Sequence, residues 1–355
     1  MGINLKIERI TLRDVAKRAG VSVPTVSRAI NKEKYVSVDV KKRVLAAVKD
    51  LNYEPEWTAR SLRLGKTNIV SIIIPNIANY FFSSVVLGIE QFFRSKGREI
   101  ILFNTSNDEK VEEKAIRIAT AKRVEGIVLA TISKNNNVIR NNIKSFGVPF
   151  VIVDNKIDVD NVDFVLHDDI NGAFKLVDHL IKIHDYKKIA CISGPLDESS
   201  GIDKLTGYKK ALKENNIPIN EEYIKIANWK KLEAYKATKE LFNMKDKPEA
   251  IFTANTNMVI GCLRYINSEN IRIPEDVAIV TFDDYDYVSA FNPPLTTLEK
   301  VDTRMGEIAA ELLYKRINGK GGKYREIRVD SGIVIRKSCG CNIDLKLENR
   351  NRKFW

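Results

Sequence analysis

Residues 11–30, TLRDVAKRAGVSVPTVSRAI, have the pattern of two short helices separated by a glycine-containing turn. Apolar residues recur through the first helix at i, i+3, i+4 and i+7, namely Leu12, Val15, Ala16 and Ala19. Gly20 is placed to end this helix, because glycine adopts the left-handed conformation without strain. Ser22 is placed to cap the second helix, where Pro24 falls in the first turn and costs no hydrogen bond.

A third amphipathic helix is predicted by one apolar face, made of Val40, Val44, Val48 and Leu51. Two helices joined by a short turn and followed by a third are typical of a helix-turn-helix bundle, so we expect a DNA-binding domain over residues 1–53. Its second helix is the expected reader of the major groove. Arg28 on this helix has the guanidinium group that binds guanine in a bidentate manner.

The positive charge of the chain is concentrated at this end. Residues 1–66 hold 15 lysines and arginines against 7 acidic residues, whereas the rest of the chain holds 43 against 39. This distribution favours a domain that binds a polyanion such as double-stranded DNA, and the alternative is a basic domain without such a partner. The residues expected to contact DNA within residues 1–53 are Thr11, Leu12, Ser22, Val23, Pro24, Thr25, Ser27, Arg28, Asn31, Tyr35, Asn52 and Tyr53.

A known family shares these segments. TLRDVAKRAGVSVPTVSRAINKEKYVS (11–37) and LNYEPEWTARSLRLGKTNIVSIIIP (51–75) resemble the head and hinge of the LacI/GalR family of bacterial transcription regulators. The resemblance extends through most of the chain to GIVIRKSCG (332–340). It implies a regulator that binds a palindromic operator as a homodimer, with its DNA affinity controlled by a small effector.

The connector at residues 54–66 is expected to be the hinge. The helix predicted from Pro55 to Arg63 is shorter than the ~12 to 15 residues that an isolated helix needs in water. In a dimer on DNA, two copies are expected to pack through Ala59 and to insert both Leu62 side chains into the minor groove. Leu62 matches the intercalating leucine of the family. The alternative is that Leu62 packs on the core.

The body of the chain alternates short apolar runs with helical periods, which predicts parallel sheets flanked by helices. Its length favours two α/β lobes over one sheet. The expected core covers residues 67–345, with one lobe at about 67–166 and 297–328 and the other at about 167–296 and 329–345, before a polar tail at 346–355. By resemblance, this core is similar to periplasmic sugar-binding proteins.

Loops that follow the predicted strands are rich in carboxylates, amides and aromatic rings, which suits a sugar or another small polar or heterocyclic ligand between the lobes. The residues expected to bind the effector, by resemblance to the family, are Asn79, Phe81, Phe82, Asp154, Lys204, Trp229, Asn255 and Asp283. Asp154, Asn255 and Asp283 are expected at ligand hydroxyls. The alternatives are a core position for each of the two phenylalanines, a helix cap for Asp283 and simple packing for Trp229.

Thr256 and Lys204 are among the positions that depart from the family pattern. Thr256 replaces an acidic residue, and Lys204 stands where many members have arginine, which exchanges a planar fork for a point charge. The lysine also occurs in the catabolite-control branch of the family, whose corepressor is a phosphorylated carrier protein. A phosphoprotein corepressor is therefore the alternative to a sugar.

The cysteines and histidines do not predict a metal site. Cys339 and Cys341 lack the second pair or the histidines of a zinc site, and His179 and His184 are five residues apart, which places them on different faces of a helix. We therefore expect reduced, mostly buried thiols, and neither a metal nor a cofactor.

Other functional classes are disfavoured. The longest apolar runs are far below the ~20 residues of a membrane span, and no apolar signal-peptide core begins the chain, so a cytoplasmic, nucleoid-associated protein is expected. An enzyme is not expected, because the chain has no phosphate-binding glycine loop and no nucleophile elbow. A plain solute receptor would leave the basic head unexplained. The polar tail lacks apolar heptads, which favours a dimer over a tetramer.

Overall fold

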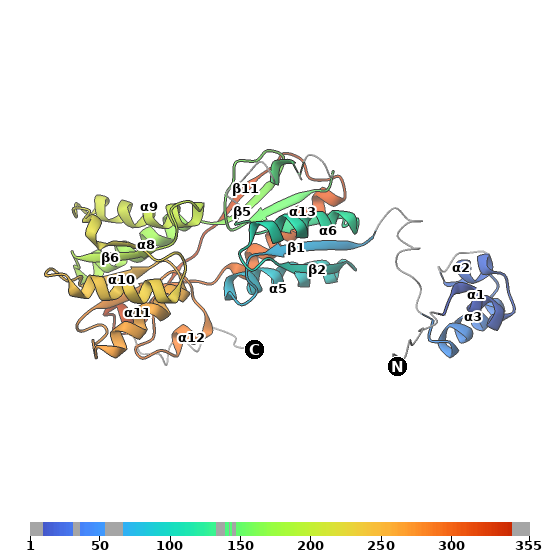
Figure 1. Ribbon diagram of the computed structural model, residues 1–355, viewed down its shortest axis with the longest axis horizontal. Helices are drawn as coiled ribbons and strands as arrows, with labels where there is room; N and C mark the ends of the chain where they lie inside the picture. Colours follow the sequence, from blue (N-terminus) through green and yellow to red (C-terminus); the bar gives the residue numbers. More distant parts are fainter. Residues whose placement is uncertain are drawn as a thin grey trace, which may run out of the picture. The chain divides into compact units, whose positions relative to one another are not determined.

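The computed structural model describes residues 10–30, 36–53, 67–132, 139–141, 143 and 147–342 (Figure 1). The chain divides into two compact units, Met1–Thr67 and Asn68–Trp355. No helix in the described ranges combines the length and the apolar character that crossing a bilayer requires. The hinge residues Ala59 and Leu62, the loop residues Asn31 and Tyr35, and the tail at 346–355 lie outside the described residues.

Within residues 10–30 and 36–53, the first unit contains three helices, as the sequence predicts: α1 (Leu12–Ala19), α2 (Val23–Ile30) and α3 (Val38–Asp50). Asp14 accepts hydrogen bonds from the backbone N–H and the hydroxyl of Thr11, at 2.8 and 2.7 Å, and so fixes the start of α1. Gly20 ends α1 with a φ of 64°. The core of this unit consists of Val15, Ala16, Ala19, Val26, Ala29, Val44, Ala47 and Tyr53.

The N-lobe of the second unit is built on a six-stranded sheet with the order β11-β5-β4-β3-β1-β2, in which all neighbours are parallel. Its strands are β1 (Ile69–Ile74), β2 (Glu99–Asn104), β3 (Gly126–Leu129), β4 (Phe150–Val153), β5 (Asp163–His167) and β11 (Glu326–Val329). Among the residues that the structure describes, the N-lobe helices with defined bounds are α5 (Tyr80–Ser95), α6 (Glu109–Ala121) and α13 (Asp302–Ile317). Val70, Ile72 and Ile74 of β1 pack with α5 and α13, whereas Ile73 packs with α6 on the other face.

The C-lobe has a four-stranded parallel sheet with the order β7-β6-β8-β9. Its strands are β6 (Ile189–Ser193), β7 (Ile224–Ile226), β8 (Ala250–Thr253) and β9 (Ala278–Thr281). Its helices are α8 (Asp169–His184), α9 (Ser199–Glu214), α10 (Lys231–Asn243), α11 (Thr256–Ser268) and α12 (Asp286–Ser289), with a 3-10 turn at Glu221–Tyr223. Buried aliphatic residues of these strands and helices form one continuous core.

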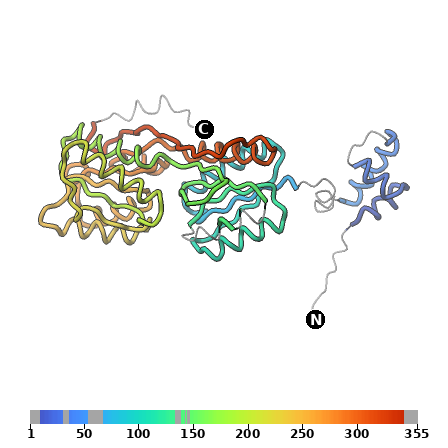
Figure 2. The backbone as a smooth tube through the Cα atoms, turned by 90° about the horizontal axis from the view of Figure 1, so that it is seen from above, coloured from blue at the N-terminus to red at the C-terminus, as the bar shows by residue number. Residues whose placement is uncertain are grey.

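Three segments pass between the lobes: from β5 to α8, from β10 (Thr297–Leu298) to α13, and from β11 to β12 (Ile333–Val334). Figure 2 shows the lobes side by side, with the C-terminal segments running between them. Strands β10 and β12 pair in antiparallel fashion next to these crossings, and a 3-10 turn, Lys337–Cys339, follows. A ligand bound between the lobes can therefore alter their angle without breaking either sheet.

Candidate functional site

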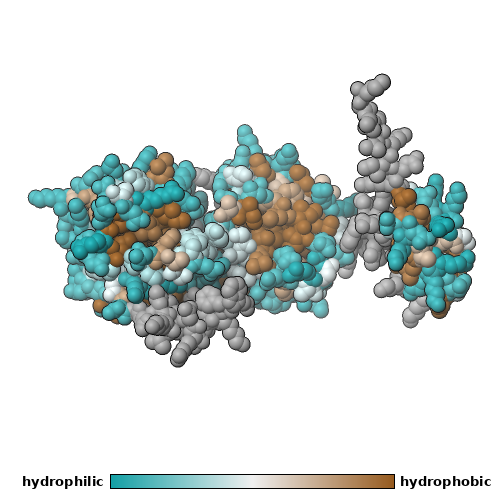
Figure 3. All heavy atoms as spheres, turned by 90° about the horizontal axis from the view of Figure 1, so that it is seen from below, coloured by the Kyte–Doolittle hydropathy of each residue, from teal (hydrophilic) through white to brown (hydrophobic). Residues whose placement is uncertain are grey.

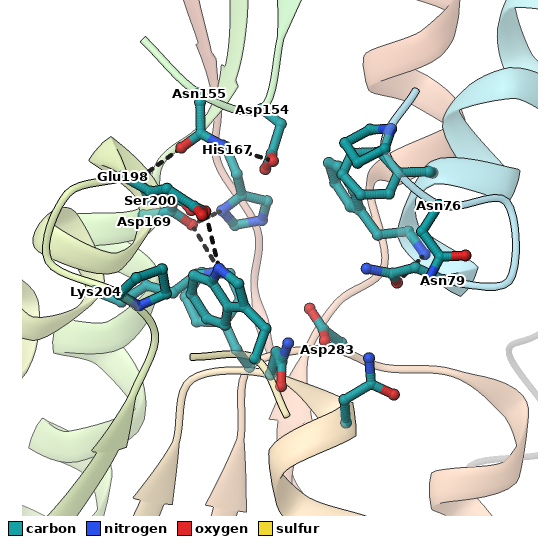
Figure 4. A pocket seen from close by; sticks show the side chains of 18 of the residues that line it. Asn76, Asn79, Asp154, Asn155, His167, Asp169, Glu198, Ser200, Lys204 and Asp283 are labelled. Atoms are coloured by element: carbon teal, nitrogen blue, oxygen red, sulfur yellow. Dashed lines mark hydrogen bonds and ion pairs between the residues drawn. The ribbon is translucent and has the colours of Figure 1, made fainter. Parts of the chain in front are cut away.

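A cleft of about 670 Å³ lies between the two lobes of the core and is lined by loops at the carboxyl ends of the strands (Figure 4). Its volume is in the range of small-molecule sites. Asn79 comes from the start of α5 and Asp154 from the loop after β4, while Lys204 comes from α9. All eight residues expected at the effector line this cleft: Asn79, Phe81, Phe82, Asp154, Lys204, Trp229, Asn255 and Asp283.

Three of these polar residues also fix the helices beside the cleft. The side-chain oxygen of Asn79 accepts from the backbone N–H of Phe81 (3.1 Å), and that of Asn255 accepts from Met258 (2.9 Å), so each caps a helix. Oδ2 of Asp283 accepts from the backbone N–H and the hydroxyl of Thr256, at 2.8 and 2.9 Å. The helix cap foreseen as the alternative for Asp283 is therefore present, alongside its place in the cleft.

The aromatic residues combine packing with a place in the cleft wall. Phe82 is 8% exposed and belongs to the N-lobe core, and Phe81 packs against that core. Trp229 has a φ of 58°, unusual for a bulky residue, and its indole N–H donates to Glu198 at 2.9 Å. A Cβ at Gly194 would lie 2.1 Å from the Trp229 ring, so glycine is required beneath the indole.

Lys204 is the buried cation of the cleft, with 8% exposure. Its Nζ lies 3.6 Å from Oδ1 of Asp169, 4.2 Å from the ring centre of Phe282 and 5.1 Å from that of Trp229. Burial alone lowers the pKa of Lys204, but the carboxylates of Asp169, Asp283 and Asp154 outweigh it and raise the pKa above its ordinary value. The ammonium group therefore stays charged.

The carboxyl groups around Lys204 have pKa values raised to near neutral pH. Burial raises the pKa of Asp154 to about 8 and that of Asp169 to about 7, although the charge of Lys204 opposes both shifts. Oδ1 of Asp169 has no hydrogen-bond partner among the described residues. Burial also raises the pKa of Asp302 to about 7 and lowers that of His167 to about 3. At neutral pH these carboxyl groups are therefore able both to donate and to accept hydrogen bonds.

Two sets of contacts join the lobes on either side of the cleft. Asn155 of the N-lobe accepts from the backbone N–H of Ser200, at the start of α9 in the C-lobe, at 3.2 Å. Tyr80 at the start of α5 lies 5.4 Å from the ring of Tyr285 and 5.3 Å from that of Tyr287, both in the C-lobe. These contacts exist only when the lobes are close, so they favour the closed arrangement.

The described head residues fall into exposed and buried groups. Pro24 and Arg28 are exposed on α2, and the hydroxyls of Ser22 and Thr25 are 2.8 Å apart, while the Thr25 N–H donates weakly to Ser22 Oγ at 3.4 Å. Thr11 and Asn52 are exposed, and Ser27 is half-buried. One face of α2 thus presents its arginine to solvent, as a recognition helix requires.

Three of the residues expected at DNA turn inward. Tyr53 is 7% exposed and belongs to the core of the head, so it has a packing role, and its DNA contact stays a prediction. The chain reverses through Asn52, with a φ of 46°, and the Tyr53 N–H donates to Val48 at 3.0 Å, which turns the ring inward. Leu12 and Val23 are half-buried and pack against the same core, and their DNA contacts stay predictions.

Comparison with known families decides what kind of protein combines this head and this cleft. Residues 67–337 match the family described as periplasmic binding proteins and sugar binding domain of LacI family, and residues 11–56 match bacterial regulatory proteins, lacI family. The chain belongs to the LacI family. The resemblance stated from the sequence is thereby confirmed, as is the α/β fold with a three-helix head.

Similar LacI-family proteins include repressors and ligand complexes. The HTH-type transcriptional repressor PurR of Aliivibrio salmonicida is 32% identical over 328 residues, which cover 92% of this chain and 98% of that protein. The Lac repressor dimer bound to operator and the anti-inducer ONPF matches with a TM-score of 0.84 and 26% identity, covering 94% and 99%. A complex of the transcriptional regulator CelR with cellobiose matches with a TM-score of 0.72 and 27% identity, covering 93% and 100%. The curated relative is a repressor, which is consistent with the expectation that this LacI-family chain is not an enzyme.

Several residues of the cleft were not foreseen from the sequence. Asp169 and His167 line it because β5 ends at its edge, and β5 was missed as a strand. Glu198 and Ser200 lie at the start of α9, and their partners Trp229 and Asn155 are far away in sequence. The signal available for Asp169 was its place at a helix start after an apolar run.

The structure also corrects the expectation for the histidines and the terminal cysteines. His179 and His184 lie with their ring centres 5.4 Å apart, although their spacing places them on different faces of a helix. Cys341 Sγ is 3.7 Å from His179 Nε2 and 3.3 Å from His184 Nε2. His184 is the last residue of α8, and residues 339–341 fold against this helix end, so both rings reach the same sulfur atom.

Proposed function

We propose that this chain is a transcriptional repressor that binds a palindromic operator as a homodimer, with its affinity controlled by a small ligand in the cleft. The observation that supports this most is the pairing, in one chain, of an exposed recognition helix with a polar cleft whose walls belong to two lobes. The protein would act in the cytoplasm on nucleoid DNA. The Lac repressor dimer on its operator provides the analogy for symmetry, since a two-fold protein reads a two-fold site.

The charges of the cleft favour a neutral ligand. Even without Asp154, Asp169 and Asp302, whose pKa values are raised to about 7 or 8, its acidic residues outnumber its lysines. The acidic residues are Glu109, Asp197, Glu198, Asp283, Asp284 and Glu299, and the lysines are Lys204, Lys230 and Lys300. A sugar acid or sugar phosphate would meet this negative field, whereas a neutral sugar offers hydroxyls to the carboxyl groups and to Asn79 and Asn255. We therefore infer a neutral sugar or sugar derivative, and the control of carbohydrate-utilisation genes.

A planar heterocycle is the second candidate ligand, because the rings of Phe81, Phe82 and Trp229 line the cleft and can cover a flat ring system. A phosphoprotein corepressor is less well supported. Lys204 was the residue that favoured it, and its ammonium is enclosed between Asp169, Phe282 and Trp229. A side chain in that position cannot reach the surface of another protein.

Coupling between ligand and operator would follow from the lobe contacts. A ligand changes the equilibrium only if it binds the two lobe arrangements with different affinity. Contacts such as Asn155 with Ser200 and Tyr80 with Tyr285 belong to the closed arrangement. Dimerisation would transmit the lobe angle to the heads. Figure 3 shows an apolar area on each lobe, and Leu87 of α5 and Leu102 of β2 are exposed apolar residues of the N-lobe.

Selection from a random pool of double-stranded DNA tests this proposal. We expect enrichment of palindromic sequences by the full chain, and a tenfold or greater loss of affinity for them in Arg28→Ala, since a bidentate arginine–guanine contact is worth about 1–3 kcal/mol. Arg94→Ala removes the same charge from an exposed site on α5 and serves as the control. Enrichment without palindromy, or equal losses in both variants, would contradict the proposal.

Asp154→Asn should stabilise the ligand-free protein at pH 8 and lower its affinity for the ligand. Burial raises the pKa of Asp154 to about 8 in the folded chain, against about 3.9 when unfolded, so the folded state binds more protons between these values and stability falls as pH rises through that window. Asparagine has no proton to lose, and it tolerates the φ of 74° at this position. The thermal midpoint of the variant should therefore exceed that of the wild type by a margin that grows from pH 5 to pH 8.

Asp185→Asn is the matched control for this measurement, because Asp185 also has a positive φ, of 58°, but its side chain is 86% exposed. Its midpoint should follow the wild type at both pH values. An Asp154→Asn midpoint that is unchanged at pH 8, or that falls there, would refute the assigned charge state.

A screen of neutral sugars and heterocycles by thermal shift identifies the ligand, since a ligand at 100 times its dissociation constant stabilises by about 2.7 kcal/mol.

A further inference from the structure

Four metal-binding side chains converge at the C-terminal end of α8, away from the residues that line the cleft. They are His179 and His184 of this helix, and Cys339 and Cys341 of the segment that follows β12. One ligand atom from each residue lies within 4.8 Å of all the others. Helix α8 is labelled in the C-lobe in Figure 1.

Three of the six distances between these atoms match the edges of one tetrahedral ion, and the other three are at most 4.8 Å. His179 Nε2 lies 3.4 Å from Cys339 Sγ and 3.7 Å from Cys341 Sγ, and His184 Nε2 lies 3.3 Å from Cys341 Sγ. Zinc bonds of about 2.3 Å to sulfur and about 2.0–2.1 Å to nitrogen give tetrahedral edges of roughly 3.3–3.8 Å. We propose that these four residues bind a zinc ion as a closed, structural Cys2His2 site.

The backbone between the two cysteines suits this arrangement. Gly340 has a φ of 107°, which other residues rarely adopt, and it directs the flanking side chains toward α8. A Cβ at Gly340 would lie 3.1 Å from His184 Nδ1 and 3.3 Å from Tyr186 Oη, so the His184 ring rests directly on the glycine. Tyr186 stacks on His184, with the two ring centres 5.6 Å apart. The imidazole is thus held in place before any ion arrives.

Surrounding groups also support the sulfur atoms. Cys339 is fully buried, and its Sγ accepts a hydrogen bond from the hydroxyl of Thr296 at 3.1 Å. Partners of this kind orient metal ligands and are a regular part of zinc sites. Cys341 and His184 are half-buried, which leaves a path for the ion. The two remaining cysteines, Cys191 and Cys262, lie separately in the C-lobe core, so only the terminal pair has this setting.

The ion would fasten the third interlobe segment to the C-lobe. Arg336 lies three residues before Cys339, is buried, and forms an ion pair with Asp284 at 2.7 Å, next to the cleft residue Asp283. With the segment fastened at residues 339–341, Arg336 and the loop that it holds keep their position. The metal therefore has a structural role, because all four positions of a tetrahedral ion are taken by protein atoms.

The metal content of the full chain, purified without a tag and under reducing conditions, tests this site. Elemental analysis should give about one zinc per chain, and cobalt(II) chloride added to the stripped protein should give the intense visible absorption of tetrahedral cobalt with thiolate ligands. Cys341→Ser and His184→Ala should lose both signals. Cys262→Ala, which removes a buried thiol outside the cluster, should keep them.

A chelator should also lower the thermal midpoint of the wild type, and zinc chloride should restore it, with no such effect in Cys341→Ser. The proposal is overturned if the folded wild type contains no zinc and gives no thiolate–cobalt spectrum. It is equally overturned if zinc binds more weakly than about 1 μM, which would mark an adventitious ion, or if Cys341→Ser and Cys262→Ala retain the same metal content.

Discussion

Replacing Lys204 with methionine is expected to lower the free energy of unfolding of the core by about 2 kcal/mol more at pH 8 than at pH 5. Lys204 is 8% exposed, and its charge is the one that opposes the burial of Asp154 and Asp169. Methionine fills a similar volume among Phe282 and Trp229, but without the charge of Lys204 the pKa values of both carboxyl groups rise further, so both are protonated in the folded variant at pH 8. The loss measures the cost of this proton uptake, and it should appear in chemical denaturation of the ligand-free protein.

The same variant should be far less damaging at pH 5. The pKa values of Asp154 and Asp169 are about 8 and about 7, so both groups are protonated at pH 5 and leave no charge to compensate. The pKa of Lys204 itself is raised, so its own titration lies above the ordinary value of 10.5 and adds no pH dependence between pH 5 and pH 8. The difference between wild type and variant therefore grows with pH.

Lys230→Met is the matched control, because this lysine also lines the cleft but its side chain is 68% exposed and it pairs with Glu233 at 3.3 Å. Its loss should stay below about 0.5 kcal/mol at both pH values. Equal destabilisation by Lys204→Met at pH 5 and pH 8 would show that packing, rather than charge, accounts for the effect. In that case the assigned charge states of Asp154 and Asp169 would be wrong.

The sequence predicted the elements that have strong local signals. Helix α1 has a complete apolar face and a glycine stop, and strands such as β1 are unbroken runs of buried aliphatic residues. Strands β5 and β11 were missed because DFVLH and EIRV are short and contain charged residues. Asp163 in β5 is tolerated because partners far away in sequence satisfy it: Arg316 of α13 donates two hydrogen bonds at 2.7 and 2.9 Å, and the Arg325 N–H donates a third at 2.9 Å. A local sequence pattern cannot reveal a partner that is so far away in sequence.

The candidate site also contains residues that the sequence predicts and residues that it does not. Loops after recognisable strands, such as the one with Asp154, were placed in the cleft, and family resemblance selected residues within them. The groups that set the charge of the cleft could be identified only from the folded structure, because Asp169 and Lys204 meet through the packing of α8 against α9. His184 and Cys341 are 157 residues apart and meet only because the last described segment folds against the end of α8. Helical spacing alone therefore gave the wrong answer for the histidines.

Removing residues 1–67 is expected to abolish operator binding, with a loss of at least 100-fold, and to leave ligand binding unchanged. Asn68–Trp355 is a compact unit with its own hydrophobic clusters, so the truncated chain should fold, which circular dichroism checks. The removed part contains α2 with Arg28 and most of the excess positive charge of the chain. The affinity for a specific site exceeds that for non-specific DNA by roughly 10³-fold or more. Non-specific electrostatic attraction therefore cannot make up for the affinity lost with the recognition helix α2.

The comparison should be made at two salt concentrations, on the palindrome selected by the full chain. Any residual binding by the truncated chain should disappear at the higher salt, because only non-specific phosphate contacts would remain. Its ligand affinity should match that of the full chain in the absence of DNA, since every residue of the cleft lies beyond residue 67. Operator affinity within tenfold of the full chain would instead place the DNA-reading surface on the core, and the role assigned to Arg28 would fall with it.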